Sequence, residues 1–253
     1  MQLQPGKKVY FASDQHFGAP TPELSFPREQ KFVNWLNEIK NDAQVLFLLG
    51  DLFDFWFEYK TVVPKGFVRV LGKLAELKDM GIEIHFFVGN HDLWMNDYFE
   101  KELQIPVYHT SQIFKFNDKS FFIAHGDGLG PGDYGYKRMK KVFTNPFSKW
   151  LFGWLHPDIG VKLAQTLSVK NKLISGDEDV VFLGEDKEWL ILYAKKKVTE
   201  QFHDYFVFGH RHLPMILDIN PEKTAQYVNL GDWISYFTYV VFDGENLELK
   251  TYK

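Results

Sequence analysis

The chain has 253 residues, 45% hydrophobic and 25% charged, enough to bury a sizeable core in one large domain or in a domain with an insertion. Its formal net charge of −4 excludes the basic excess by which nucleic-acid-binding proteins are recognised, so we expect no nucleic acid partner. The chain contains no cysteine, which excludes disulfides and thiolate metal sites.

The N-terminal residues 1–8 are polar and lead directly into a predicted strand. They lack the apolar stretch of a signal peptide. No window of the sequence has the roughly 18 consecutive apolar residues of a membrane span. We therefore expect a cytoplasmic protein.

Residues 8–127 alternate apolar runs rich in β-forming residues with helical patterns. Helices are predicted at 28–40 and 67–80, where apolar side chains recur at helical spacing, and Gly81 follows the second one as a helix stop. Strands are predicted at 9–12, 45–49, 84–88 and 121–124. This alternation predicts an α/β fold.

The alternation stops at about Gly130, and from there to Lys197 the sequence has helical patterns with many aromatic and basic residues. Strand patterns then resume at 205–208, 215–219, 225–229, 237–242 and 247–251. We therefore predict a layered core, residues 1–129 and 198–253, interrupted by a helical insertion, or lid, at 130–197.

Five of the predicted strands end in polar clusters, and these are the main functional signal of the sequence. They are Asp14-Gln15-His16, Gly50 to Asp54, Gly89-Asn90-His91-Asp92, His125-Gly126-Asp127 and Gly209-His210-Arg211-His212. The carboxyl ends of strands in an open α/β sheet gather at one edge, so we expect the clusters to meet there. A single Asp after a strand is usually a turn or a helix cap, but five clusters in this order predict one shared site.

The clusters carry the ligands of hard divalent cations, and two such cations about 3.5–4 Å apart clamp a phosphoryl group. Asp14 and His16 are two residues apart and would point to the same side of an extended segment, as would His210 and His212. Asp51 is suited to bridge two metals, because each carboxylate oxygen can serve one of them. Asn90 and His125 would complete the second metal site.

The order DxH, GDxxD, GNHD, HGD and GHxH resembles that of calcineurin-like metallophosphoesterases and spans residues 14–212. The resemblance implies a four-layer αββα sandwich with the site at its top edge. It also implies two divalent ions, with Mn²⁺ expected although Fe, Zn, Co or Ni occur in relatives. One metal would be held by Asp14, His16, Asp51 and His212, and the other by Asp51, Asn90, His125 and His210.

This resemblance implies in-line attack on phosphorus by a water whose pKa the metals lower. His91, next to Asn90, is placed to donate a hydrogen bond or a proton to the phosphoryl oxygens or the leaving group. Asp92 could orient His91 or could instead cap a helix. The expected catalytic residues are therefore His91, Asn90 and Asp92.

Three stretches resemble the UDP-2,3-diacylglucosamine diphosphatase branch of that family, which acts in lipid A biosynthesis. They are the aromatic run 50–56, the HGDGL block 125–129 with Asp133, Tyr136 and Lys137 after it, and the apolar lid entry 145–152. The resemblance implies water attack on the α-phosphorus of UDP-2,3-diacylglucosamine, giving 2,3-diacylglucosamine 1-phosphate (lipid X) and UMP. Two features differ from that branch, which carries Arg in place of His91 and a loop less rich in glycine after the HGD cluster.

The insertion combines apolar and basic residues, which suits a substrate with acyl chains and a diphosphate. The apolar residues are Val142, Phe143, Phe147, Trp150, Leu151, Phe152, Trp154 and Leu155, and the basic ones are Lys137, Arg138, Lys140, Lys141 and Lys149. The same combination suits peripheral contact with the cytoplasmic face of an anionic inner membrane. We expect substrate contacts from Asp133, Tyr136, Lys137, Trp150, Phe152, Lys170, Asn171 and Lys172. Alternatively, the aromatic residues pack the insertion onto the core and the lysines are solvated.

Other functions remain possible with the same residues. A metallophosphoesterase could act on another nucleotide diphosphate, a phosphodiester, a phosphomonoester or a phosphoprotein, although a small soluble substrate would not require the apolar insertion. A non-catalytic protein-binding scaffold is disfavoured because all seven expected ligand positions carry ligating residue types. A nuclease is disfavoured by the acidic net charge.

Overall fold

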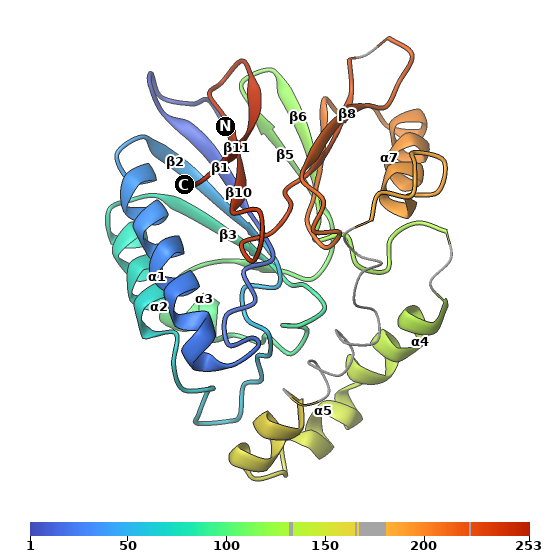
Figure 1. Cartoon of the computed structure of the whole chain (residues 1–253). Coiled ribbons are helices and arrows are strands. Elements are labelled where there is room, and N and C mark those ends of the chain that lie inside the picture. Colours follow the sequence, from blue (N-terminus) through green and yellow to red (C-terminus); the bar gives the residue numbers. More distant parts are fainter. Residues whose placement is uncertain (132–133, 165, 167–180, 223) are drawn as a thin grey trace.

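The computed structural model describes residues 1–131, 134–164, 166, 181–222 and 224–253, which form two β-sheets flanked by helices (Figure 1). The first sheet has the strand order β11-β10-β1-β2-β3-β4. Its strands are β1 (Lys8–Ala12), β2 (Ala43–Leu49), β3 (Glu83–Phe87), β4 (Val107–Tyr108), β10 (Thr238–Phe242) and β11 (Leu247–Thr251). Strands β1 to β4 run parallel, and β10 pairs antiparallel with both β1 and β11.

The second sheet has the order β5-β6-β7-β9-β8. Its strands are β5 (Gln112–Phe116), β6 (Lys119–Ile123), β7 (Tyr205–Phe208), β8 (Met215–Asp218) and β9 (Gln226–Asn229). The parallel pairs β6·β7 and β7·β9 form its centre, and antiparallel β5 and β8 form its edges.

The two sheets pack face to face because their strands alternate apolar side chains on both faces. In β1, Val9 and Phe11 belong to the core between the sheets, whereas Tyr10 packs on the opposite side. The ring of Phe11 stacks on that of Phe121 in β6, with centroids 5.8 Å apart.

Helices cover the outer faces of both sheets (Figure 1). Helices α1 (Pro22–Ile39) and α2 (Val68–Asp79) cover the first sheet with buried side chains such as Trp35 and Leu74. Helix α7 (Trp189–Glu200) covers the second sheet through Leu190, Ile191 and Ala194. The layers therefore run α/β/β/α, and the predicted fold class is confirmed.

Helices α4 (Tyr134–Phe143) and α5 (Pro146–Phe152) lie beyond one end of the sandwich, at the lower right of Figure 1, and bury no residue of their own. Residues 157–164 are also helical. The boundary that we predicted at residue 197 falls inside α7, whose packing belongs to the sandwich. We therefore propose that the insertion ends before Trp189.

Several element boundaries differ from the sequence prediction. Helix α1 begins six residues earlier than expected, because Thr21 caps its N-terminus and Pro22 fits the first turn. The prediction did not include β4, β5 or the short helix α3 (Tyr98–Glu102). None of the helices in the described ranges has the length and apolar character that a membrane span requires.

Candidate metal centre

The polar clusters that follow β1, β2, β3, β6 and β7 meet at one end of the sandwich, so the first and second sheets both contribute to the site. Five of the seven predicted ligands have a left-handed backbone conformation. Their φ values are 58° at Asp14, 47° at His16, 52° at Asp51, 67° at His210 and 39° at His212. This conformation costs a non-glycine residue about 1–3 kcal/mol and is found mostly at functional sites. The folded core therefore holds these side chains in positions that an isolated loop would avoid.

Glycines allow these loops to approach one another closely. A Cβ atom on Gly89 would lie 2.2 Å from the Asp51 Oδ1 atom, and one on Gly50 would lie 2.6 Å from the His125 Nδ1 atom. A Cβ atom on Gly209 would lie 2.6 Å from the Asp14 Oδ2 atom. Any larger residue at these positions would displace a predicted ligand, so each glycine is a structural requirement of the site.

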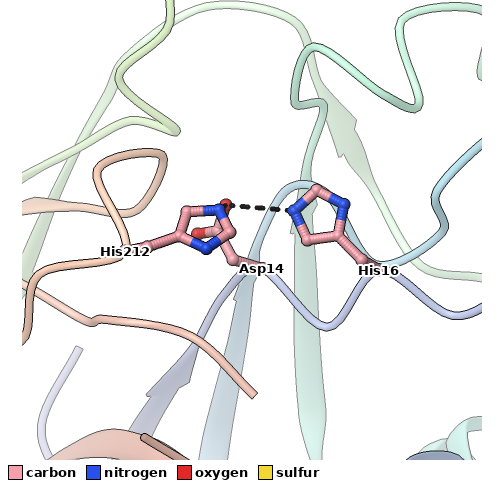
Figure 2. Close-up of side chains that lie close together, drawn as sticks. All are labelled: Asp14, His16 and His212. Atoms are coloured by element: carbon pink, nitrogen blue, oxygen red, sulfur yellow. Dashed lines mark ion pairs between the residues drawn. The ribbon is translucent and has the colours of Figure 1, made fainter. Parts of the chain in front are cut away.

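The Asp14 carboxylate presents one oxygen to two imidazoles. Its Oδ2 atom accepts hydrogen bonds from the Ser13 hydroxyl and from the His210 backbone N–H, the latter at 2.9 Å. Its Oδ1 atom lies 3.3 Å from His212 Nε2 and 3.8 Å from His16 Nε2, and Figure 2 shows both rings beside the carboxylate. This buried oxygen has no hydrogen-bond partner among the described residues, so it is available to a cation.

The Asp51 carboxylate lies between two other imidazoles. Its Oδ1 atom accepts a 2.8 Å hydrogen bond from the His91 backbone N–H. Its Oδ2 atom lies 3.7 Å from His16 Nε2 and 3.5 Å from His125 Nε2. This arrangement fits the expected bridging role of Asp51, because the carboxylate lies between residues assigned to both metals.

A second group of ligand atoms converges around the Asn90 side chain. The Asn90 Oδ1 atom lies 3.1 Å from His125 Nε2 and 2.9 Å from His210 Nδ1. The structure thus brings together three of the four residues that were expected to hold the second metal, Asn90, His125 and His210.

Two of the imidazoles are oriented by hydrogen bonds from the nitrogen that faces away from the centre. His125 Nδ1 lies 2.6 Å from the Leu49 carbonyl oxygen, which can only accept, so Nδ1 carries the proton. His212 Nδ1 lies 3.1 Å from the Asp232 Oδ2 atom in the same way. Such contacts leave the Nε2 lone pair available to a metal and are usual around metal-binding histidines.

Opposite charges set the pKa values within this buried centre. Burial lowers the pKa of His125, but the charges of Asp51 and Asp14 raise it to about 9. Burial also opposes the charged form of His212, yet Asp14 and Asp232 raise its pKa to about 10. Burial would raise the pKa of Asp14, but the charge of His212 holds it well below its usual value. Without metal, the centre thus holds protons on imidazoles beside carboxylates, and divalent cations can replace those protons.

The residues present fit divalent metals. Ligand atoms lie within 4.8 Å of one another in three groups: Asp14, His16 and His212; His16, Asp51 and His91; and Asp14, Asp51 and His125. The groups share members and therefore form one continuous centre. Oxygen and imidazole donors suit Mn²⁺, Fe, Co, Ni and Zn.

The His91 ring lies beside this centre and is oriented by Asp54. Its Nδ1 atom lies 2.9 Å from the Asp54 carbonyl oxygen and 3.6 Å from the Asp54 carboxylate. The ring also meets that of His16 edge to face, with centroids 4.6 Å apart. Because a carbonyl oxygen can only accept, the Nδ1 atom of His91 carries a proton.

Asp92 has other contacts than those expected from the sequence. Its carboxylate accepts hydrogen bonds from the backbone N–H groups of Gly89, at 2.6 Å, and Leu52, at 3.0 Å. It lies six residues before the next helix, α3, whose N-cap is Asp97, so Asp92 is not a helix cap. Burial and the charge of Asp51 raise the pKa of Asp92 to about 8. Asp92 therefore ties two ligand loops together, and Asp54 occupies the position that we expected Asp92 to have.

Sequence reasoning missed Ser13, Asp54 and Asp232. A signal for Asp54 was present, since it is the second Asp of the GDxxD cluster. Asp232 also follows a predicted strand, 225–229, and its buried position next to His212 emerges only in the folded chain.

Two of the expected substrate-contact residues lie close to the metal centre. The Tyr136 hydroxyl donates a hydrogen bond to the Asp127 carboxylate, and its ring is 6.5 Å from that of His210. The Lys137 ammonium donates to the Gly130 carbonyl oxygen at 2.7 Å. The remaining polar residues expected here, Asp133, Lys170, Asn171 and Lys172, lie outside the described residues.

The two aromatic residues expected to contact substrate point in different directions. Phe152 packs onto the core, with its ring 4.5 Å from that of Trp94. Trp150 is 57% exposed, and its ring lies 5.7 Å from Phe147 and 5.8 Å from Trp154. One face of α5 therefore anchors the insertion to the core, and the other presents aromatic surface.

Comparison with known proteins agrees with this architecture. Residues 7–214 match the model of the calcineurin-like phosphoesterase family, and the chain belongs to that family. It is 38% identical to the UDP-2,3-diacylglucosamine hydrolase of Porphyromonas gingivalis, covering 96% of this chain and 97% of the relative. The UDP-2,3-diacylglucosamine hydrolase of Histophilus somni is 27% identical, over 90% of this chain and 92% of the relative. The chain is accordingly a metal-dependent hydrolase.

Proposed function

We propose that the protein hydrolyses UDP-2,3-diacylglucosamine to 2,3-diacylglucosamine 1-phosphate and UMP. The observation that carries this proposal is the convergence of seven oxygen and imidazole ligands at the end of the sandwich. The substrate is suggested by the 38% identical relative, whose name is UDP-2,3-diacylglucosamine hydrolase. The basic and aromatic insertion beside the centre supports a substrate that has both charged and apolar parts.

Two Mn²⁺ ions are the proposed cofactors. Asp14, His16, Asp51 and His212 would hold one ion, and Asp51, Asn90, His125 and His210 would hold the other. When bound, the ions would lower the pKa of the attacking water and offset negative charge on the phosphoryl oxygens.

The proposed reaction is an in-line displacement at the α-phosphorus. The water oxygen forms a bond to this phosphorus while the bond to the bridging oxygen breaks. The electron pair stays on the bridging oxygen, which leaves with the phosphate of the diacylglucosamine 1-phosphate. The water proton passes to solvent or to a base.

His91 would support the transition state from the side of the centre. Its Nδ1 proton is held by the Asp54 carbonyl oxygen, so its Nε2 atom can donate a hydrogen bond only when the imidazole is protonated. A hydrogen bond from this nitrogen would stabilise charge on a phosphoryl oxygen or on the leaving group.

The exposed face of α5 would contact acyl chains or the membrane surface. The apolar patch here, defined as Phe147, Trp150 and Leu151 of α5 and Trp154 just after it, has exposed fractions of 67%, 57%, 56% and 74%. Such apolar surface beside basic residues favours peripheral attachment to an anionic membrane, here the inner membrane.

The proposal is tested by incubating the Mn²⁺-loaded protein with UDP-2,3-diacylglucosamine in ¹⁸O-labelled water. We expect UMP and lipid X by mass spectrometry, with the label in UMP. Label in lipid X would contradict attack at the α-phosphorus. Absence of UMP together with turnover of an aryl phosphodiester would assign the site to another phosphoester.

Variants test the assigned ligands in the same assay. Asp51→Ala and His125→Ala should each abolish UMP formation and leave the circular dichroism spectrum unchanged. Asp218→Ala, which removes an exposed carboxylate at the end of β8, is the matched control. Turnover by either ligand variant at the rate of the control would remove that residue from the centre.

A further inference from the structure

A pocket of about 590 Å³ opens beside the metal centre and shares His125 with it. Its apolar lining includes Phe87, Val88 and Ala124 at the ends of β3 and β6. The loop from His125 to Leu129, residues 108–111 and helix α4 also line it. A group attached to a phosphate at the metal centre can therefore extend directly into this pocket.

Helix α4 gives the pocket its positive charge. Lys137, Lys140 and Lys141 all line it, because residues three and four positions apart lie on the same face of a helix. Asp127 is the one carboxylate among the described lining residues, and it pairs with Lys140 at 2.5 Å. The pocket thus has two ammonium groups, those of Lys137 and Lys141, beyond the one that Asp127 balances.

The segment 109–111 adds neutral polar side chains to the lining. Thr110 and Ser111 contribute hydroxyls, and His109 contributes an imidazole. Burial and the charge of Lys149 lower the pKa of His109, so its ring is neutral at neutral pH. The lining therefore combines cationic side chains with neutral hydrogen-bonding groups, which suits an anion with several oxygens.

We propose that this pocket binds the second phosphate of a diphosphate substrate, the one that leaves with the sugar, while the attacked phosphate occupies the metal centre. This inference rests on the proposed function. As the bond to the attacked phosphorus breaks, negative charge grows on the departing phosphate. The cationic side chains of α4 that line the pocket would stabilise that charge. Lys137 and Lys141 are therefore assigned to the leaving group.

The test is calorimetric titration of the Mn²⁺-loaded protein with methylenediphosphonate, which cannot be hydrolysed at its bridge, and with methylphosphonate, which has one phosphoryl group. A charge-assisted contact changes affinity by about 10- to 100-fold, so the wild-type protein should prefer the diphosphonate by at least about 10-fold. Lys141→Ala should reduce this preference by about 10-fold, and Lys141→Arg should largely restore it. Lys141 is the informative position, because Lys137 and Lys140 also hold Gly130 and Asp127 in place.

Arg138→Ala is the matched control, because it removes a positive charge from the same helix at a position that does not line the pocket. An unchanged preference in Lys141→Ala would overturn the inference. An equal loss of UMP and diphosphonate binding in that variant would assign the pocket to the nucleoside monophosphate and would also overturn it. The titration uses no lipid, so failure to hydrolyse UDP-2,3-diacylglucosamine would contradict the proposed function separately.

Discussion

Replacing Asp232 by Asn should weaken one of the two metal sites without unfolding the protein. Asp232 is 2% exposed, and its Oδ1 atom accepts hydrogen bonds from the backbone N–H groups of Ile234, Ser235 and Tyr236 at 2.9, 2.7 and 3.1 Å. The Asn side chain keeps an oxygen for these three bonds. It places an NH₂ group where Oδ2 accepts from His212 Nδ1.

The tautomer of His212 determines the size of the effect. Without metal the His212 ring is protonated on both nitrogens, and it must lose its Nε2 proton to bind a metal. An NH₂ group cannot accept the remaining Nδ1 proton, so in the variant the neutral ring would instead keep its proton on Nε2. There it would donate to the Asp14 Oδ1 atom, 3.3 Å away, and occupy the lone pair that a metal needs. Loss of such an orienting group typically costs 10–100-fold in metal affinity, about 1.4–2.8 kcal/mol. We expect this loss at the site that contains His212.

Calorimetric titration of the metal-free protein with Mn²⁺ measures the two affinities. Asp204→Asn is the control, because Asp204 also accepts a backbone hydrogen bond, from Ser120, but lies at the start of β7 rather than at its metal-binding end. Thermal melts in EDTA should show similar stability for both Asn variants. Asp232→Ala, in contrast, removes the side-chain oxygen that accepts three backbone N–H hydrogen bonds, at about 0.5–1.5 kcal/mol each, and should melt earlier. Binding of both ions by Asp232→Asn with wild-type affinity would refute the argument.

Three further predictions follow from the site and the insertion. The raised pKa values of His125 and His212, about 9 and about 10, keep both rings protonated at pH 7. Metal binding should therefore release about two protons at pH 7 and progressively fewer as the pH rises above 9. Titration in buffers of different ionisation enthalpy measures the number of protons released, and zero release at pH 7 would contradict the assignment of these histidines as ligands. Gly89→Ala should abolish metal binding, because its Cβ would lie 2.2 Å from Asp51 Oδ1. The control Gly72→Ala, with open space around it in α2, should bind metal normally and gain up to about 1 kcal/mol of stability. Normal metal binding by Gly89→Ala would show that the loops after β2 and β3 can separate. The double variant Trp150→Ser and Trp154→Ser should lower affinity for anionic vesicles by about 10-fold in a sedimentation assay. The control Val68→Ser removes an exposed apolar residue from α2 and should leave this affinity unchanged.

Most of the fold could be predicted from the sequence because strand and helix periodicity reflect burial directly. The predicted strands at 205–208 and 247–251 coincide with β7 and β11, and the others differ by one or two residues. Strand β5 was not predicted, since its alternation of Phe114 and Phe116 with polar residues lies between a two-residue strand and a turn. Its pairing with β6 is a long-range property that no local window contains.

The residues proposed as ligands could be selected from the sequence, because metal chemistry restricts ligands to a few residue types, and the structure brings these residues together. Their supporting contacts could not. The sequence motif places Asp92 next to His91, but neighbours along a turn point in different directions, and the backbone directs Asp92 toward Gly89 and Leu52 instead. Asp54 reaches His91 only because the loops after β2 and β3 lie side by side. Likewise, Trp150 and Phe152 are two residues apart on α5 and therefore face opposite sides.

The origin of the ligands in both sheets has a mechanical consequence. Asp14, His16, Asp51 and Asn90 follow strands of the first sheet, whereas His125, His210 and His212 follow strands of the second. Each proposed metal therefore has ligands from both sheets and would link one sheet to the other. A substitution in the core between the sheets, such as at Phe11 or Phe121, would change the distances between the proposed metal ligands. The rate of catalysis in this protein should therefore depend on how well its two sheets are aligned.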